Sequence, residues 1–222
     1  ETIALINQHK QRVREMSDKE IPQIYLITPA NTDITFYTET LAPLLDICPV
    51  ACIRLGLSSD DENLISRHAD QLREVAHARD ISAVITTHYR LVNSLGLDGV
   101  HRLDAAKTIR EIREELGTEA IVGSYCGTSR HVGMNAGEIG ADYISFGPVD
   151  HSALTDENIA EFATFEWWSE MVEIPVVAEG NVTLELAAQL APVIDFLALG
   201  QEIWKTDTPL NELQEYLLRI SK

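Results

Sequence analysis

The chain has few basic residues. Its 222 residues include 17 lysines and arginines against 35 aspartates and glutamates, which gives a formal net charge of −18. Proteins that bind nucleic acid present a basic surface to the phosphates, so this composition predicts no nucleic-acid partner. The same charge slows the approach of an anionic substrate unless basic side chains gather at one place.

Cysteines and long apolar runs are also scarce. The three cysteines, Cys48, Cys52 and Cys126, have neither the spacing of a metal site nor the even number of a disulfide framework, which fits a reducing compartment. No apolar run approaches the roughly 18 residues of a membrane-spanning helix, and the first 20 residues are too polar for a signal peptide. The sequence therefore predicts a cytoplasmic protein without a membrane partner.

What the chain does contain is a regular alternation of short apolar segments with stretches of helical character. The expected strands are 24–27, 50–55, 83–85, 99–101, 121–122, 143–147, 176–178 and 196–200. Such an alternation indicates parallel pairing, and eight units favour a closed (β/α)8 TIM barrel of the α/β class. No glycine-rich dinucleotide fingerprint follows the first strand, which counts against a doubly wound sheet. We predict a single TIM-barrel domain, with the barrel over 24–222 and an extra leading helix over 1–20.

Polar residues gather at the carboxyl ends of the expected strands. In a parallel barrel these ends meet at one opening, the barrel mouth, where the active sites of such enzymes lie. We predict three catalytic residues: Arg54, His101 and Glu179. The residues expected to contact a substrate or its phosphate are Arg54, Thr86, Thr87, Tyr125, Cys126, Gly147, Gly180, Asn181, Gly200 and Gln201. The glycine loops among them would offer backbone N–H groups to a phosphate.

Several of these side chains also have a purely structural explanation. Glu179 could act as a general base, or it could pair with Arg54 across the mouth and plug it. His101 could be a satisfied histidine inside the barrel, Tyr125 could fill space, and Cys126 could be an inert buried thiol.

Two further arginines leave alternatives open. Arg102 and Arg130 could join Arg54 in binding a phosphate or carboxylate. They could instead pair with nearby acids such as Asp104 and Glu138.

Six motifs resemble the thiamine phosphate synthase family, which includes thiazole tautomerase relatives. They are IYLITP (24–29), DGVH (98–101), GSYCGTSRH (123–131), GADY (140–143), FGP (146–148) and DFLALGQEIW (195–204). Family members are (β/α)8 barrels that join a pyrimidine pyrophosphate to a thiazole phosphate, with Mg²⁺ holding the pyrophosphate. The resemblance implies this fold, a transferase of thiamine biosynthesis, a small phosphorylated ligand, Mg²⁺ and a homodimer.

The chain departs from the family pattern on the second and third strands. The family's second strand reads Q-x-R-x-K, and of these three residues only Arg54 remains, between Cys52 and Gly56. Thr86 and Thr87 stand where the third strand carries Asn-Asp, whose aspartate binds the metal.

The later strands depart as well. Ala106 replaces a second metal carboxylate, which leaves Asp104 as the weak metal candidate. The loop over 151–155 lacks the family's lysine, and Gly180-Asn181 replaces Gly-Gly. The tautomerase histidine is expected just after the fifth strand, and the nearest one here, His131, lies about one helical turn further on.

These losses predict impaired synthase activity. Mg²⁺ requires oxygen ligands, usually carboxylates, and fixed cations stabilise a departing pyrophosphate. Two alternatives follow: a non-catalytic paralogue that binds a phosphorylated heterocycle, and an enzyme with altered chemistry. In the second case His88, His101, His151 and Asp104 could bind Zn, Mn or Fe, although their spacing gives no support.

Overall fold

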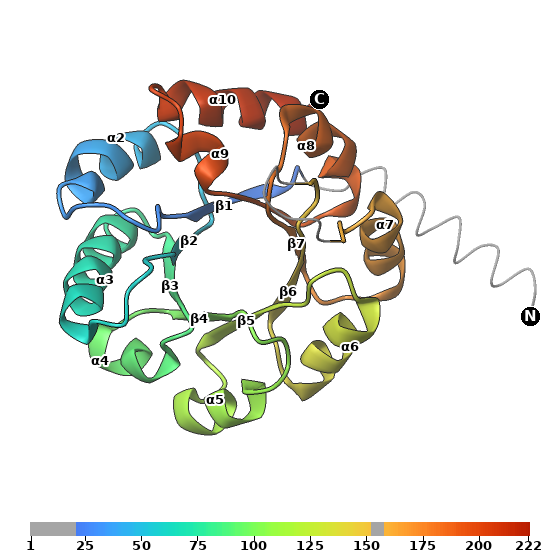
Figure 1. Cartoon of the computed structure of the whole chain (residues 1–222), viewed down its shortest axis with the longest axis horizontal. Helices are drawn as coiled ribbons and strands as arrows, with labels where there is room; N and C mark the ends of the chain where they lie inside the picture. The colour runs from blue at the N-terminus through green and yellow to red at the C-terminus, as the bar shows by residue number, and fades with distance from the viewer. Residues whose placement is uncertain (1–20, 152–157) are drawn as a thin grey trace, which may run out of the picture.

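Eight parallel strands close into a barrel in the computed structural model, which describes residues 21–151 and 158–222 (Figure 1). The strands are β1 (Gln23–Ile27), β2 (Cys52–Leu55), β3 (Ser82–Thr86), β4 (Gly99–Arg102), β5 (Ile121–Tyr125), β6 (Tyr143–Phe146), β7 (Val176–Ala178) and β8 (Phe196–Leu199). Each pairs with its neighbour in sequence, and β8 pairs with β1. The predicted TIM barrel is confirmed, whereas the predicted leading helix over 1–20 lies outside the described residues.

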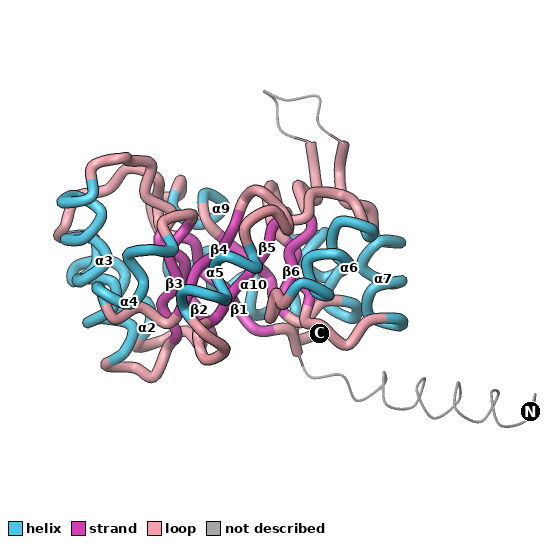
Figure 2. Tube along the Cα trace, turned by 90° about the horizontal axis from the view of Figure 1, so that it is seen from below, coloured by secondary structure: helices cyan, strands magenta, loops and turns pink. Residues whose placement is uncertain are grey.

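Helices surround the ring of strands, as a parallel sheet requires for its crossover connections (Figures 1 and 2). They are η1 (Tyr37–Leu41), α2 (Ala42–Leu45), α3 (Glu62–His77), η2 (Tyr89–Leu91), α4 (Val92–Leu95), α5 (Ile109–Leu116), α6 (Arg130–Ile139), α7 (Phe162–Met171), α8 (Leu184–Leu190), η3 (Ala191–Val193), α9 (Gln201–Trp204) and α10 (Pro209–Ile220). Within the described ranges, no helix combines the length and apolar character needed to cross a membrane.

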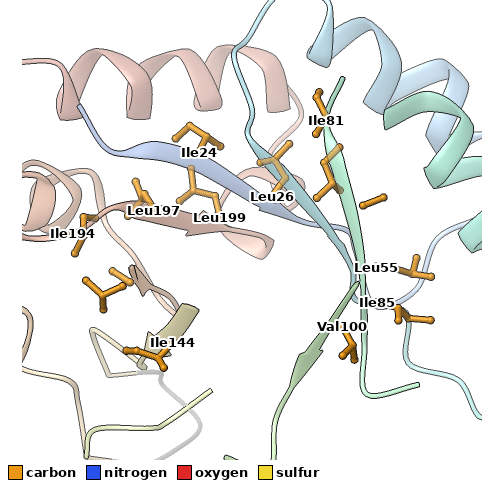
Figure 3. Close-up of a cluster of buried hydrophobic side chains, with 14 of the residues drawn as sticks. Ile24, Leu26, Leu55, Ile81, Ile85, Val100, Ile144, Ile194, Leu197 and Leu199 are labelled. Atoms are coloured by element: carbon orange, nitrogen blue, oxygen red, sulfur yellow. The ribbon is translucent and has the colours of Figure 1, made fainter. Parts of the chain in front are cut away.

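The larger core lies between the strands and the helices. Along β1, Ile24 and Leu26 point outward into this core, while Tyr25 between them points into the barrel. Figure 3 shows the outward side chains of several strands, including Val100 and Leu199, which are fully buried. This layer of branched aliphatic side chains fixes the register of each strand, because a slip by one residue would turn the strand's outward apolar side chains into the barrel.

The barrel interior changes character along its axis. A mostly apolar inner cluster is formed by Tyr25, Cys52, Val84, Tyr143, Val177 and Ala198. Toward the carboxyl ends, the inward positions on β2, β3, β4 and β6 and the position directly after β7 hold Arg54, Thr86, His101, Ser145 and Glu179. The sequence alternation thus places a polar level above an apolar one.

The seam between the first and last strands has an added clamp. The indole Nε1 of Trp204, in the short helix α9 after β8, donates a hydrogen bond of 2.6 Å to the carbonyl oxygen of Ile27. This bond joins residues 177 positions apart in the chain.

Candidate active site at the barrel mouth

A buried ion pair crosses the barrel interior at the mouth. Arg54 lies on β2 and Glu179 directly follows β7, and the two residues are only 6% and 9% exposed. Arg54 Nη1 donates to Glu179 Oε2 at 3.2 Å, and Nη2 lies 3.5 Å from Oε1. The guanidinium carbon also stands 5.7 Å from the ring centre of Tyr25. Of the two explanations for Glu179, the structure therefore shows the pairing with Arg54.

A chain of hydrogen bonds runs below this ion pair. His101 Nδ1 lies 3.0 Å from the hydroxyl of Tyr143, which lies 2.8 Å from the hydroxyl of Tyr25. The rings of His101 and Tyr143 are stacked with centroids 5.6 Å apart. Burial and the nearby Arg54 lower the pKa of His101 well below its ordinary value, so the imidazole is neutral. Burial raises the pKa of both tyrosines, so their hydroxyls stay protonated.

Gly123 makes this arrangement possible. A Cβ atom at Gly123 would lie 2.0 Å from the ring carbon Cζ of Tyr143. The missing side chain on β5 therefore leaves the space in which Tyr143 reaches across to His101.

Unpartnered polar atoms mark the space around the ion pair. Among the residues that the structure describes, the buried atoms Arg54 Nε, Thr86 Oγ1, His101 Nε2 and Ser145 Oγ have no hydrogen-bond partner. His101 Nε2 lies 3.9 Å from Glu179 Oε2, beyond hydrogen-bond distance. Buried polar groups are nearly always paired, and leaving one unpaired costs about 1–3 kcal/mol. These atoms come from four different strands and form a set that a small polar ligand or ordered water would satisfy.

The metal candidate Asp104 is already engaged. Arg102 Nε and Nη2 donate to its two carboxylate oxygens at 3.0 Å and 2.7 Å, and the arginine holds the pKa of Asp104 below its ordinary value. Thr87 contributes its carbonyl oxygen to Arg102 Nη1 at 2.6 Å. No three His, Cys, Asp or Glu residues in the described ranges stand where they could share a metal ion. This donor set does not fit the Mg²⁺ that the family resemblance implies, nor the alternative Zn, Mn or Fe site.

The three arginines do not converge on one anion position. Arg102 pairs with Asp104, which is the second of the two alternatives, pairing with a nearby acid. Arg130 donates to the carbonyl oxygen of Ala163 at 2.6 Å and packs over the ring of Trp167, rather than pairing with Glu138. Of these three arginines, Arg54 is the one with an unpartnered buried atom, its Nε.

The candidates at the carboxyl end of β5, Tyr125 and Cys126, are held by local contacts. The hydroxyl of Tyr125, the last residue of β5, donates to the carbonyl oxygen of Gly147. Cys126 Sγ lies 3.5 Å from the carbonyl oxygen of Ser124, and burial raises the pKa of this thiol to about 11. Cys126 is therefore a poor nucleophile at neutral pH.

The loops after β6 and β7 pack tightly against each other. A Cβ atom at Gly147 would lie 2.1 Å from the carbonyl oxygen of Glu179. Gly180 has a φ of 86° and Asn181 a φ of 57°, a conformation in which Asn181 Nδ2 donates to the carbonyl oxygen of Asp150 at 3.0 Å.

The expected phosphate loop after β8 holds a side chain that the sequence analysis missed. Gly200 N–H donates to Oε2 of Glu202 at 2.8 Å, and Val182 N–H donates to Oε1 at 3.2 Å. Gln201, the predicted contact, is exposed. Tyr25, Tyr143 and Ser145 were missed too. The signal for them was their inward position on β1 and β6, two strands that supplied no predicted side chain.

Comparisons with known proteins agree with this architecture. A family model described as thiamine monophosphate synthase matches residues 24–203. A thiamine-phosphate synthase from Rhodospirillum centenum is 38% identical over 184 residues, 82% of this chain and 89% of that protein. A thiamine-phosphate synthase from Erythrobacter litoralis is 36% identical over 199 residues, which is 86% of this chain and 93% of that protein. A thiamine phosphate pyrophosphorylase from Pyrococcus furiosus has a similar fold, with a TM-score of 0.76 and 19% identity over 90% of this chain and 95% of that one.

Proposed function

Because the chain belongs to the thiamine monophosphate synthase family, we propose that it binds a small heterocyclic ligand of thiamine biosynthesis at the barrel mouth without catalysing the Mg²⁺-dependent coupling. The observation that carries this proposal is the Arg54–Glu179 pair. By resemblance, Arg54 is the surviving pyrophosphate ligand of its strand, and here a carboxylate of the same chain compensates its charge.

The chemistry of the coupling explains why this matters. A departing pyrophosphate develops negative charge, which fixed cations and metal ions stabilise. At this mouth Arg54 is paired with Glu179, and Arg102 is paired with Asp104. Neither arginine offers an uncompensated charge to a leaving group.

The remaining groups suit a neutral polar ring. The neutral His101 and the hydroxyls of Thr86 and Ser145 can donate or accept hydrogen bonds, and Arg54 Nε can donate one. Such a set recognises ring nitrogens and exocyclic groups rather than a cluster of negative charges.

Ordinary synthase activity is the second candidate. Its support is the 38% identity to a relative named thiamine-phosphate synthase over 89% of that protein. In this case a bound pyrophosphate would draw Arg54 away from Glu179.

Calorimetric titration with thiazole phosphate, pyrimidine pyrophosphate and thiamine phosphate, with and without Mg²⁺, separates the two candidates. We expect a heterocycle to bind equally well in both conditions, with no thiamine phosphate formed on mixing the two substrates. Mg²⁺-dependent binding of the pyrophosphate followed by turnover would establish the synthase instead. No binding of any of the three compounds or their unphosphorylated forms would refute the proposal.

Matched variants locate the binding site. Ser145→Ala removes an unpartnered buried hydroxyl at the mouth and should weaken binding about tenfold. Ser169→Ala removes an exposed hydroxyl on α7 and should leave binding unchanged. Equal affinities in both variants would show that the ligand does not bind at the mouth.

The family resemblance further leads us to propose a cytoplasmic homodimer. Light scattering on the eluting protein would measure the mass of the assembly, and a mass of one chain would contradict it.

A further inference from the structure

The carboxylate of Glu202 occupies the backbone donors that a phosphate would use in this fold. In TIM barrels, phosphate sites commonly form at the loops after the seventh and eighth strands. Val182 lies in the loop after β7 and Gly200 directly follows β8, and the N–H groups of both point at Glu202. One oxygen of the carboxylate serves each loop, at 3.2 Å and 2.8 Å, so the side chain bridges the two.

These two N–H groups are the principal partners of the carboxylate. Within the described residues, Glu202 forms no ion pair with a lysine, arginine or histidine. Its negative charge therefore faces backbone dipoles, as the charge of a bound anion would.

The bridge is held firmly on the β7 side. The hydroxyl of Tyr216, on α10, donates to the carbonyl oxygen of Val182 at 2.6 Å, so both polar backbone groups of Val182 are engaged. Burial, together with the negative charges of Glu202 and Glu212, raises the pKa of Tyr216 to about 12. The Val182 backbone is thus fixed with its N–H directed toward Glu202.

We propose that Glu202 is a specificity-determining residue that acts as a tethered anion and makes this barrel select the unphosphorylated form of its heterocyclic ligand. A phosphate at these loops would compete with the carboxylate for the same two donors and would be repelled by its charge. The unphosphorylated alcohol leaves the bridge intact. This inference rests on the proposed function and refines it, because it names which form of the ligand the barrel selects.

The first test needs no heterocycle and uses inorganic phosphate as the probe. Phosphate binding to the full chain is measured by ³¹P NMR for the unchanged protein, Glu202→Gln and Glu202→Ala. We expect both variants to bind phosphate at least tenfold more tightly than the unchanged protein, which corresponds to about 1.4 kcal/mol. Glu185→Gln removes the same charge at an exposed site on α8 and should bind phosphate like the unchanged protein.

The second test compares the thiazole alcohol with its phosphate. We expect the unchanged protein to prefer the alcohol, and Glu202→Gln to shift the preference at least tenfold toward the phosphate. The inference is overturned if the folded variants bind phosphate no more tightly than Glu185→Gln, or if the unchanged protein prefers the phosphorylated form. Glu202→Gln keeps the shape of the side chain, so it remains informative where Glu202→Ala unfolds. If neither heterocycle binds, the proposed function fails, and the phosphate measurement alone decides the role of Glu202.

Discussion

Replacing Glu179 with leucine measures how strongly the mouth depends on its internal ion pair. The substitution leaves the Arg54 guanidinium in place, in a residue that is only 6% exposed. Glu179 supplies the counter-charge of Arg54 and accepts hydrogen bonds from its Nη1 and Nη2, and the substitution removes all of these. The third nitrogen, Nε, already has no partner among the described residues.

The expected cost follows from this geometry. Breaking a buried ion pair by removing one partner destabilises a protein by about 3–5 kcal/mol, because the other charge stays buried. We expect about 3 kcal/mol, the lower end of that range, because both side chains keep a little exposure to solvent, 7% for Arg54 and 12% for Glu179. Replacing both partners by apolar residues is often nearly neutral, so Arg54→Met combined with Glu179→Leu should recover most of the lost stability.

Urea denaturation followed by tryptophan fluorescence provides the assay. With a denaturant slope of about 3 kcal/mol/M, the midpoint of Glu179→Leu should fall by about 1 M. Asp46→Leu serves as the control, because it breaks an exposed ion pair to Arg79 with a distance of 2.8 Å and should hardly move the midpoint. A midpoint shift for Glu179→Leu no larger than for Asp46→Leu would refute this reasoning. It would also be refuted if the double variant lost as much stability as the single variants Arg54→Met and Glu179→Leu together.

Three further predictions rest on the barrel interior. His101 stays neutral in the folded state but protonates near pH 6.5 when unfolded, so acidification stabilises the unfolded state. The free energy of unfolding should therefore drop by about 2 kcal/mol between pH 7 and pH 5, and His101→Gln should lose this part of the drop in urea titrations. Gly123→Ala should destabilise the fold by at least ~2 kcal/mol in the same assay, because its Cβ would clash with the ring of Tyr143. Burial raises the pKa of Cys52 to about 12 and of Cys126 to about 11, so a thiol reagent at pH 8 should label them only after unfolding.

Each of these predictions has a contradicting outcome. An identical pH dependence of the unchanged protein and His101→Gln would show that His101 titrates alike in both states. An unchanged midpoint for Gly123→Ala would mean that Tyr143 can move aside without cost. Rapid labelling of Cys52 or Cys126 in the native chain would show that the thiols are accessible.

The fold could be read from the sequence because its signal is repeated. Each strand is a short apolar run with its own boundary residues, and β7 has the predicted limits, Val176 to Ala178. The second strand begins at Cys52 rather than Val50, because Val50 and Ala51 belong to the segment that leads into the barrel. Such differences of one or two residues leave the topology unchanged.

The site was predictable only in part, for a physical reason. The alternation of side chains places Arg54, His101 and Glu179 at one end of the barrel, yet it does not determine which of them pair across the interior. That depends on distances between β2, β4 and β7, which are far apart in the sequence. Arg54 and Glu179 were therefore predicted as a pair only as one of two alternatives.

Other residues escaped prediction because their types suggest another role. Tyr25 and Tyr143 are aromatic residues of a kind that strands favour, and only the gap at Gly123 shows that Tyr143 reaches His101. Glu202 follows the last strand like an ordinary surface acid in a chain of net charge −18. Its contact with Val182 joins the segment after β8 to the loop after β7, and no pattern in the neighbouring residues predicts such a contact.

The clamp between Trp204 and Ile27 bears on how the chain folds. It joins positions 177 residues apart, and closing so long a loop costs entropy before the contact returns any stability. We therefore expect the β1–β8 seam to form late, after the strands between have paired. Weakening the clamp, for example with Trp204→Phe, should accelerate unfolding in stopped-flow measurements and leave the rate of folding nearly unchanged.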